Sequence, residues 1–265
     1  MFRTSHGRVR SILAVCAVLV TVAALGGCSA RASSEAYSAE AYSADAASAV
    51  AGDRLPDLIA LPPEAFHWGY QDGHRGLRFT SLIQNIGDGP IDVTGERPDT
   101  SHDMKVTQNI FQSSGGQRHV LTDAVMQYSV KDGHNHFHLL DLALYRIRPV
   151  DSATWQEAHK EGFCLVDDAD LQGRTPFQYP DDCGADEPDA LEVREGLSVG
   201  WVDDYNWTLW GQFFDVTGLS LPGDFCVDVT VDPLHLFSEK TTSNNSASSL
   251  IHLTPETVTV VRQGC

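Results

Sequence analysis

The sequence predicts an all-β protein, an antiparallel β-sandwich with long irregular loops and little helix. From Leu55 onward, short apolar runs are separated by Gly, Pro, Asp and Asn. Residues 224–231 (DFCVDVTV) alternate between polar and apolar with a period of two, as a half-buried strand does. Helical periodicity is weak throughout, and residues 151–161 are the one stretch that favours a helix. A single domain of about 210 residues accounts for these features.

Six segments are expected to form strands, each an apolar or alternating run that ends at turn-forming residues. In chain order they are PDLIAL (56–61), LRFTSLIQNIGDGPIDVTG (77–95), AVMQYSV (124–130), HFHLLDLALYRI (136–147), DFCVDVTVDP (224–233) and SSLIHLTPETVTVV (248–261). Residues 167–196 are rich in Asp, Pro and Gly and predict a long irregular loop. A loop of that length is usually functional or pinned, and Cys183 offers the pin.

The N-terminus has the features of a secretory signal peptide over residues 1–27. Three arginines and no acid precede the 14-residue apolar stretch 12–25, which is too short to span a membrane. The small residues before Cys28 are similar to the lipobox of bacterial lipoproteins, in which the cysteine is lipidated. A plain secretory signal that leaves Cys28 free is the alternative. We therefore expect an extracellular protein, either lipid-anchored to the outer face of a bacterial membrane or secreted.

Residues 28–54 predict a low-complexity tether, which leaves 55–265 as the folded domain. The tandem units EAYSA, EAYSA and DAASA contain almost no large aliphatic residues and cannot bury a core. The net charge of −18 would become −21 once the signal arginines are removed, so nucleic acid is not an expected partner. The acidity either attracts a cationic ligand or only keeps an exported protein soluble. Membrane contact is expected only through the lipid.

Four cysteines remain after the signal and the lipidation site are set aside: Cys164, Cys183, Cys226 and Cys265. An even number in an oxidising compartment predicts two disulfides, with three possible connectivities. The pairing of near neighbours, Cys164 with Cys183 and Cys226 with Cys265, is the one we expect.

Residues 132–145 (DGHNHFHLLDLALY) carry three histidines at alternate positions. On a strand, His134, His136 and His138 project from one face, but the first and third lie roughly 13 Å apart. A bend or bulge next to Lys131-Asp132-Gly133 would be needed to bring all three to one ion. Three imidazoles suit copper or zinc and leave a position open. The alternative is a set of surface histidines on an exposed or edge strand.

Four segments resemble, in order, the signature segments of the lysyl oxidase family of copper amine oxidases. They are DGHNHFH (132–138), EAHKEGFCL (157–165), LSVGWVDDYN (197–206) and VDPLHLFSEKTTSNNSAS (231–248). The stretches LPDL at Leu55 and LRFTSLIQNIGDGP resemble the start of the same catalytic domain, so the likeness spans nearly all of 55–265.

The resemblance implies a specific chemistry for matching residues. The three histidines fall on the family's copper ligands, and Lys160 and Tyr205 fall on the pair that forms lysine tyrosylquinone. Such an enzyme uses molecular oxygen to oxidise primary amines, peptidyl lysine above all, to aldehydes, and releases hydrogen peroxide and ammonia. Taken singly, Lys160 is an ordinary surface charge and Tyr205 ordinary packing. Asp203 and Asp204 are the candidates for the catalytic base, and loop solvation is their alternative role.

The chain also departs from the family pattern. Vertebrate members have a cysteine where this chain has Gly133 and a cysteine pair where it has Trp201 and Gly211, whereas Cys164 aligns with a family half-cystine. Packing of Trp201, Trp207 and Trp210 is expected to hold the tyrosine segment instead. Two further functions stay open: a non-enzymatic copper-binding lipoprotein of the same fold, and a structural adhesion module.

Overall fold

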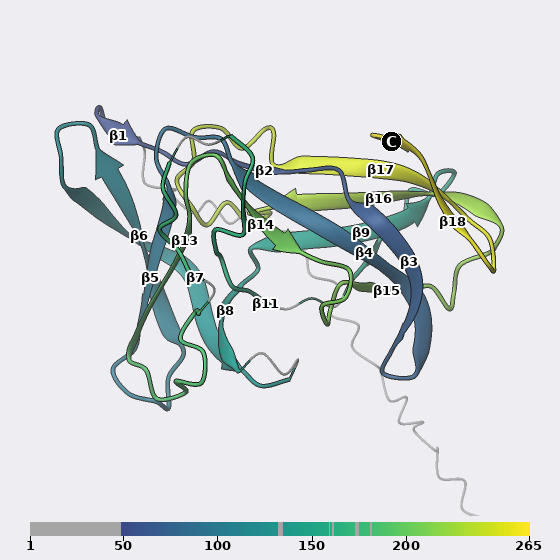
Figure 1. Ribbon diagram of the computed structural model, residues 1–265, viewed down its shortest axis with the longest axis horizontal. Coiled ribbons are helices and arrows are strands. Elements are labelled where there is room, and N and C mark those ends of the chain that lie inside the picture. Colours follow the sequence, from purple (N-terminus) through teal and green to yellow (C-terminus); the bar gives the residue numbers. More distant parts are fainter. Residues whose placement is uncertain (1–48, 132–134, 159, 161, 173–174, 181) are drawn as a thin grey trace, which may run out of the picture. The chain divides into compact units, whose positions relative to one another are not determined.

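The structure is a computed structural model that describes residues 49–265 except 132–134, 159, 161, 173–174 and 181 (Figure 1). The described residues form 18 β-strands and no helix, and their strand pairings are antiparallel. The all-β prediction is therefore confirmed. The signal peptide, Cys28 and most of the expected tether lie outside the described residues. In the part of the chain that is described, no helix has the length and apolar character to span a bilayer.

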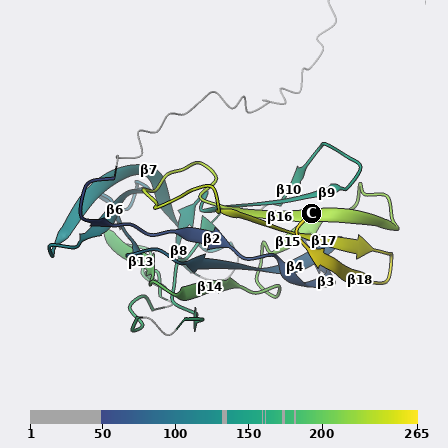
Figure 2. The ribbon, with the colours of Figure 1, turned by 90° about the horizontal axis from the view of Figure 1, so that it is seen from above.

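Two sheets pack face to face as the layers of a sandwich (Figure 2). Phe79 of one layer packs edge-on against Tyr145 of the other, with ring centroids 5.0 Å apart. The Tyr145 hydroxyl also bonds to Ser81 Oγ at 2.6 Å. The five-stranded layer consists of β10 (Gln156–Glu157), β9 (Ala143–Pro149), β16 (Gly223–Val231), β17 (Ser246–Leu253) and β18 (Val258–Gln263). The six-stranded layer consists of β2 (Leu58–Ala60), β3 (Glu64–Gln71), β4 (His74–Asn85), β12 (Ala169–Asp170), β14 (Trp201–Tyr205) and β15 (Phe213–Asp215).

A third, seven-stranded sheet carries the histidine segment. Its path runs β11-β8-β7-β6-β5-β13, and β1 pairs with β6. The bounds are β1 (Asp53–Arg54), β5 (Ile91–Glu96), β6 (Met104–Gln112), β7 (Gln117–Ser129), β8 (His136–Leu140), β11 (Gly162–Phe163) and β13 (Glu192–Leu197). The histidine strand β8 thus lies between β7 and β11 rather than at an edge.

The expected helix at 151–161 is wrong. Residues Gln156–Glu157 form β10, which pairs with β9. Trp155 supports this arrangement, because the guanidinium groups of Arg146 and Arg148 lie 4.9 and 4.7 Å from its ring centroid. Cation–π contacts to an adjacent strand outweigh a weak helical periodicity.

The loop expected at 167–196 is shorter than predicted, because β12 and β13 take up parts of it. β13 pairs with β5 over six residues. Both expected disulfides are present: Cys164–Cys183 pins the loop to the segment after β11, and Cys226–Cys265 joins β16 to the C-terminus.

The segment 231–248 holds β2 through side chains rather than lining the pocket described below. Partly buried Glu239 accepts hydrogen bonds from the Leu58 amide at 2.6 Å and from Asn245 Nδ2 at 2.9 Å. Asn244 Nδ2 donates to Asp57 Oδ1 at 2.9 Å. This fourth signature segment therefore has a structural place in the sandwich.

Candidate active site

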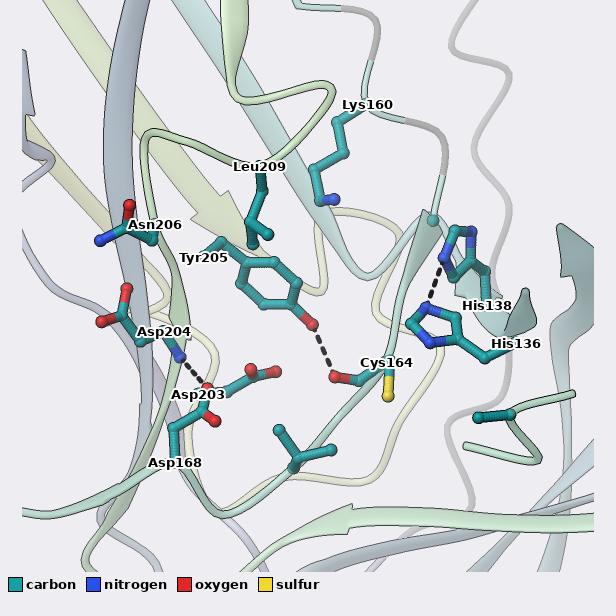
Figure 3. Close-up of a pocket in the computed structure, with 13 residues that line it drawn as sticks. His136, His138, Lys160, Cys164, Asp168, Asp203, Asp204, Tyr205, Asn206 and Leu209 are labelled. Carbon is teal, nitrogen blue, oxygen red and sulfur yellow. Dashed lines mark hydrogen bonds between the residues drawn. The ribbon is translucent and has the colours of Figure 1, made fainter. Parts of the chain in front are cut away.

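A pocket of about 410 Å³ collects most of the predicted site residues that the structure describes (Figure 3). These residues come from four separate segments: β8, the β10–β11 connection, β14 and its neighbours, and the 162–185 region. The lining consists of His136, His138, Lys160, Gly162, Cys164, Val166, Asp168, Ala185, Asp203, Asp204, Tyr205, Asn206 and Leu209. Residues far apart in the chain thus share one cavity.

Two of the predicted metal ligands lie side by side. The Nε2 atoms of His136 and His138 are 2.9 Å apart, and the two residues are only 9 % and 7 % exposed. The third, His134, lies outside the described residues. Strand β8 begins only at His136, and Asn135 before it has a positive φ of 51°. The chain therefore leaves the extended conformation immediately before His136. The bend predicted next to Lys131-Asp132-Gly133 involves residues outside the described part of the chain.

The histidine pair has the donor chemistry that copper and zinc both prefer, two imidazole nitrogens. The two Nε2 atoms lie within hydrogen-bonding distance of each other, close enough to contact one ion together. Their burial argues against histidines on a solvent-exposed strand.

Lys160 and Tyr205 are also neighbours in space. The Lys160 Nζ atom lies 4.9 Å from the centroid of the Tyr205 ring and 5.1 Å from that of Phe163. Phe163 packs edge-on against Tyr205, with centroids 5.0 Å apart. The ammonium group is therefore held over two aromatic rings, one of which is the predicted quinone precursor.

The Tyr205 hydroxyl is buried and donates a hydrogen bond to the carbonyl oxygen of Cys164 at 2.9 Å. Burial raises the pKa of this phenol well above 10, and the nearby carboxyl of Asp203 raises it further. Tyr205 is therefore a neutral, fixed phenol before any oxidation. Figure 3 shows the Tyr205 hydroxyl directed at Cys164, with the Lys160 side chain near the ring.

The two candidate bases differ in environment although they are adjacent. Asp203 is 2 % exposed, and burial is the largest cause of its raised pKa, which interaction with Tyr205 and Lys160 partly offsets. Its Oδ2 atom makes no hydrogen bond within the described part of the chain. Asp204 is exposed, and its amide donates to Asp168 Oδ2 at 2.7 Å. The buried Asp203 has an oxygen available to accept a proton.

Strand geometry and glycine bring these groups together. Residues 203 and 205 are two apart on β14, so both side chains point to the same face. Gly162 of β11 lies against His138: a Cβ at this position would come within 2.8 Å of His138 Cγ and closer still to its Cβ. Gly211, with φ of 81°, lies beside Lys160, where a side chain would be strained.

Tryptophan packing supports β14 and the residues after it. Trp201 Nε1 donates to the carbonyl of Thr175 at 2.9 Å, and its ring lies 5.6 Å from that of Phe177. The Trp207 ring packs against His67 with centroids 4.2 Å apart. Trp201 and Trp207 therefore pack against neighbouring segments, as expected for side chains that hold the Tyr205 segment in place.

Sequence reasoning missed Asp168 and Gly162 as pocket residues. Asp168 reaches the pocket because the adjacent β12 pairs with β14, with Ala169 opposite Val202. A strand pairing that involves only two residues leaves no recognisable pattern in the local sequence. Gly162 had a usable signal, since a glycine inside a strand often marks close backbone approach.

Comparisons with known proteins agree with this site. Residues 99–265 match the lysyl oxidase family. The chain is similar to Lysyl oxidase homolog 2 of Rattus norvegicus, with 27 % identity over 70 % of this chain and 19 % of that protein. It is also similar to Lysyl oxidase homolog 1 of Homo sapiens (31 % identity, covering 46 % of this chain and 20 % of that protein) and to Protein-lysine 6-oxidase of Sus scrofa (32 %, 42 % and 41 %).

The chain thus aligns with about a fifth of the length of the two homologs and less than half of the pig protein. The family match itself covers well over half of the 265 residues. The chain belongs to the lysyl oxidase family.

Proposed function

We propose that this protein is a copper-dependent amine oxidase that converts primary amines, peptidyl lysine above all, to aldehydes with release of hydrogen peroxide and ammonia. The observation that carries the proposal is the convergence of His136, His138, Lys160 and Tyr205 on one pocket. A copper-binding protein without catalysis needs the histidines but has no use for a lysine held over a buried tyrosine.

The residues divide into a metal group and a cofactor group. His136 and His138 would hold copper together with His134, and Lys160 and Tyr205 would form lysine tyrosylquinone. Copper and the quinone would supply the two-electron oxidation of the amine and the reduction of molecular oxygen, which no protein side chain supplies by itself.

The surrounding side chains bind and orient the reactants. Asp203 would take up the substrate proton at Oδ2, the buried oxygen that makes no hydrogen bond in the described structure. Val166, Leu209 and Ala185 contribute apolar surface to the cavity. Asp168 adds a carboxylate to the lining and would attract the ammonium group of an approaching amine.

The location proposed is outside the cell. Two disulfides in the folded domain fit an oxidising compartment. The proposed signal peptide, and the lipid on Cys28, would place the domain on the outer face of a membrane through a flexible tether that lets it reach macromolecular amines.

The test is amine-dependent formation of hydrogen peroxide. The exported chain is loaded with copper in air and mixed with n-butylamine or with a short lysine-containing peptide. We expect peroxide and the matching aldehyde in equal amounts. Lys160→Arg and Tyr205→Phe should each lower turnover by more than about a thousandfold, because removal of either residue prevents formation of the cofactor.

The copper content of the variants distinguishes loss of the cofactor from loss of metal binding. Both variants should bind as much copper as the unmodified protein, since neither residue is a proposed ligand. A copper-loaded protein that makes no peroxide with any amine would contradict the oxidase and favour the copper-binding alternative.

A further inference from the structure

One peptide group connects Tyr205 to a buried carboxyl outside the pocket. The carbonyl oxygen of Cys164 accepts the Tyr205 hydroxyl at 2.9 Å. The amide of Leu165, the other end of the same peptide group, donates to Glu195 Oε2 at 3.1 Å. Hydroxyl, peptide and carboxyl therefore form a continuous hydrogen-bonded chain.

Glu195 is deeply buried for an acid. It lies in β13, is 1 % exposed, and has an Oε1 atom with no hydrogen bond among the described residues. Such burial is costly, so an acid at this position needs a reason. Burial also raises the pKa of Glu195 well above its usual range, which favours the neutral acid near Tyr205 and Asp203.

The peptide that Glu195 contacts is anchored on other sides as well. The Leu165 carbonyl accepts from the Gly196 amide at 3.1 Å, so residues 195 and 196 hold both polar groups of Leu165. Cys164 is tied to Cys183, whose carbonyl accepts from the Phe137 amide of the histidine strand at 2.9 Å. The acceptor of the Tyr205 hydroxyl is thus fixed relative to β8.

We infer that Glu195 is a positioning residue for Tyr205, acting through the Cys164–Leu165 peptide. Donation from the Leu165 amide to Glu195 polarises the peptide and strengthens its carbonyl as an acceptor, because linked hydrogen bonds reinforce each other. The hydroxyl, and with it the ring over which the Lys160 ammonium group lies, is then held in one orientation. The inference rests on the proposed function for its purpose, since a fixed ring would aid formation of the quinone.

The first test uses metal-free protein with isotope-labelled tyrosine Cζ, whose NMR resonance reports hydrogen bonding of the hydroxyl. The Tyr205 resonance is identified by its loss in Tyr205→Phe. Glu195→Leu removes the acceptor and should shift this resonance. Glu195→Gln keeps an oxygen of similar position and should leave it where it is in the unmodified protein. A purely structural glutamate would lower stability without moving the tyrosine signal.

The second test perturbs the same series of hydrogen bonds at Tyr205 instead of Glu195. It therefore does not require that Glu195→Leu folds. Tyr205→Phe removes the donor to Cys164, so the Leu165 amide should bond more weakly to Glu195 and exchange with solvent about twofold or more faster. Tyr145→Phe is the matched control, because it removes a buried hydroxyl that bonds to Ser81 instead. That variant should leave the Leu165 exchange rate unchanged.

The third readout is the rate at which the cross-linked Lys160–Tyr205 peptide appears after copper is added in air. We expect Glu195→Leu to slow it at least about tenfold at unchanged copper content, and Glu195→Gln to restore it. If the unmodified protein forms no cross-link, the proposed function fails while the NMR and exchange measurements still test Glu195. A folded Glu195→Leu protein with an unmoved Tyr205 resonance, together with unchanged Leu165 exchange in Tyr205→Phe, would overturn the inference.

Discussion

Asp203 and Asp204 are neighbours in β14, yet their carboxyl groups have different surroundings. Asp203 shares a face with Tyr205 and is buried, whereas Asp204 points the other way and is exposed. The alternation of a strand therefore separates two residues that looked equivalent as bases. Burial and an unbonded oxygen favour Asp203 as the group that receives the substrate proton.

Replacement of Asp203 by Asn should lower amine turnover about a hundredfold or more while the Lys160–Tyr205 cross-link still forms. Steady-state peroxide release measures the first effect and peptide mass the second. Asp204→Asn is the control and should lose far less turnover. Equal losses of turnover in the two variants would contradict the assignment of Asp203 as the catalytic base.

The pH profile of turnover provides a second check on Asp203. Because burial raises the pKa of Asp203, the carboxyl stays protonated, and so inactive as a base, to a higher pH than an ordinary aspartate. Turnover should therefore fall as pH is lowered through this raised pKa, at a pH clearly above 4. The acid limb of the profile should vanish in Asp203→Asn.

At the scale of elements, the contact between β8 and β11 determines where the histidines sit. Gly162 pairs with Leu140, and its backbone lies directly against His138. A methyl group there has no room unless one of the two strands moves, and overpacking of this kind costs about 1–3 kcal/mol.

Gly162→Ala should therefore weaken copper binding at least about tenfold through displacement of His138. A competition titration with a chelator of known affinity measures the change. Gly218→Ala is the matched control, because a Cβ at residue 218 meets nothing within 4 Å. Copper binding by Gly162→Ala at the affinity of the unmodified protein would show that β8 and β11 tolerate separation.

The two disulfides should have separable effects. They close loops with sequence separations of 19 and 39 residues, and loss of either is expected to cost about 3–4 kcal/mol of unfolding free energy. Only Cys164–Cys183 adjoins the carbonyl that receives the Tyr205 hydroxyl.

Paired replacement of Cys164 and Cys183 by Ala should thus slow cross-link formation as well as destabilise the fold. Paired replacement of Cys226 and Cys265 should destabilise the fold and leave the cross-linking rate unchanged. Denaturant unfolding and peptide mass distinguish the two effects. Equal cross-linking rates in both paired variants would contradict the role given to the Cys164 carbonyl.

At the scale of the whole molecule, the sequence predicted the β class, both disulfide pairings and the shared pocket of Lys160, Tyr205 and two histidines. The first follows from periodicity, the second from an even number of cysteines paired between near neighbours, and the third from the resemblance to the lysyl oxidase family. The features that the sequence did not predict depend on strand pairing between residues far apart in the chain. Residues 192–196 fall in the loop expected from its Asp, Pro and Gly content. They belong instead to β13, which pairs with β5, and this strand buries Glu195.

The negative charge of the chain leads to a prediction about substrates. With a net charge of −18, the protein should attract amines at long range, and salt screens such attraction. For a peptide with several lysines, kcat/KM should fall about tenfold or more between low salt and 1 M salt while kcat changes little. A peptide with a single cationic group should show a shallower dependence. Salt-independent kcat/KM for both peptides would assign the acidity to solubility alone.

The central claim is that Lys160 and Tyr205 become one cofactor beside a copper-binding histidine pair. The most direct measurement is to load the protein with copper in air, trap it with phenylhydrazine and map its peptides by mass spectrometry. The account predicts a coloured adduct on a species that joins the Lys160 and Tyr205 peptides. Unmodified, separate peptides from a protein that holds copper would contradict it.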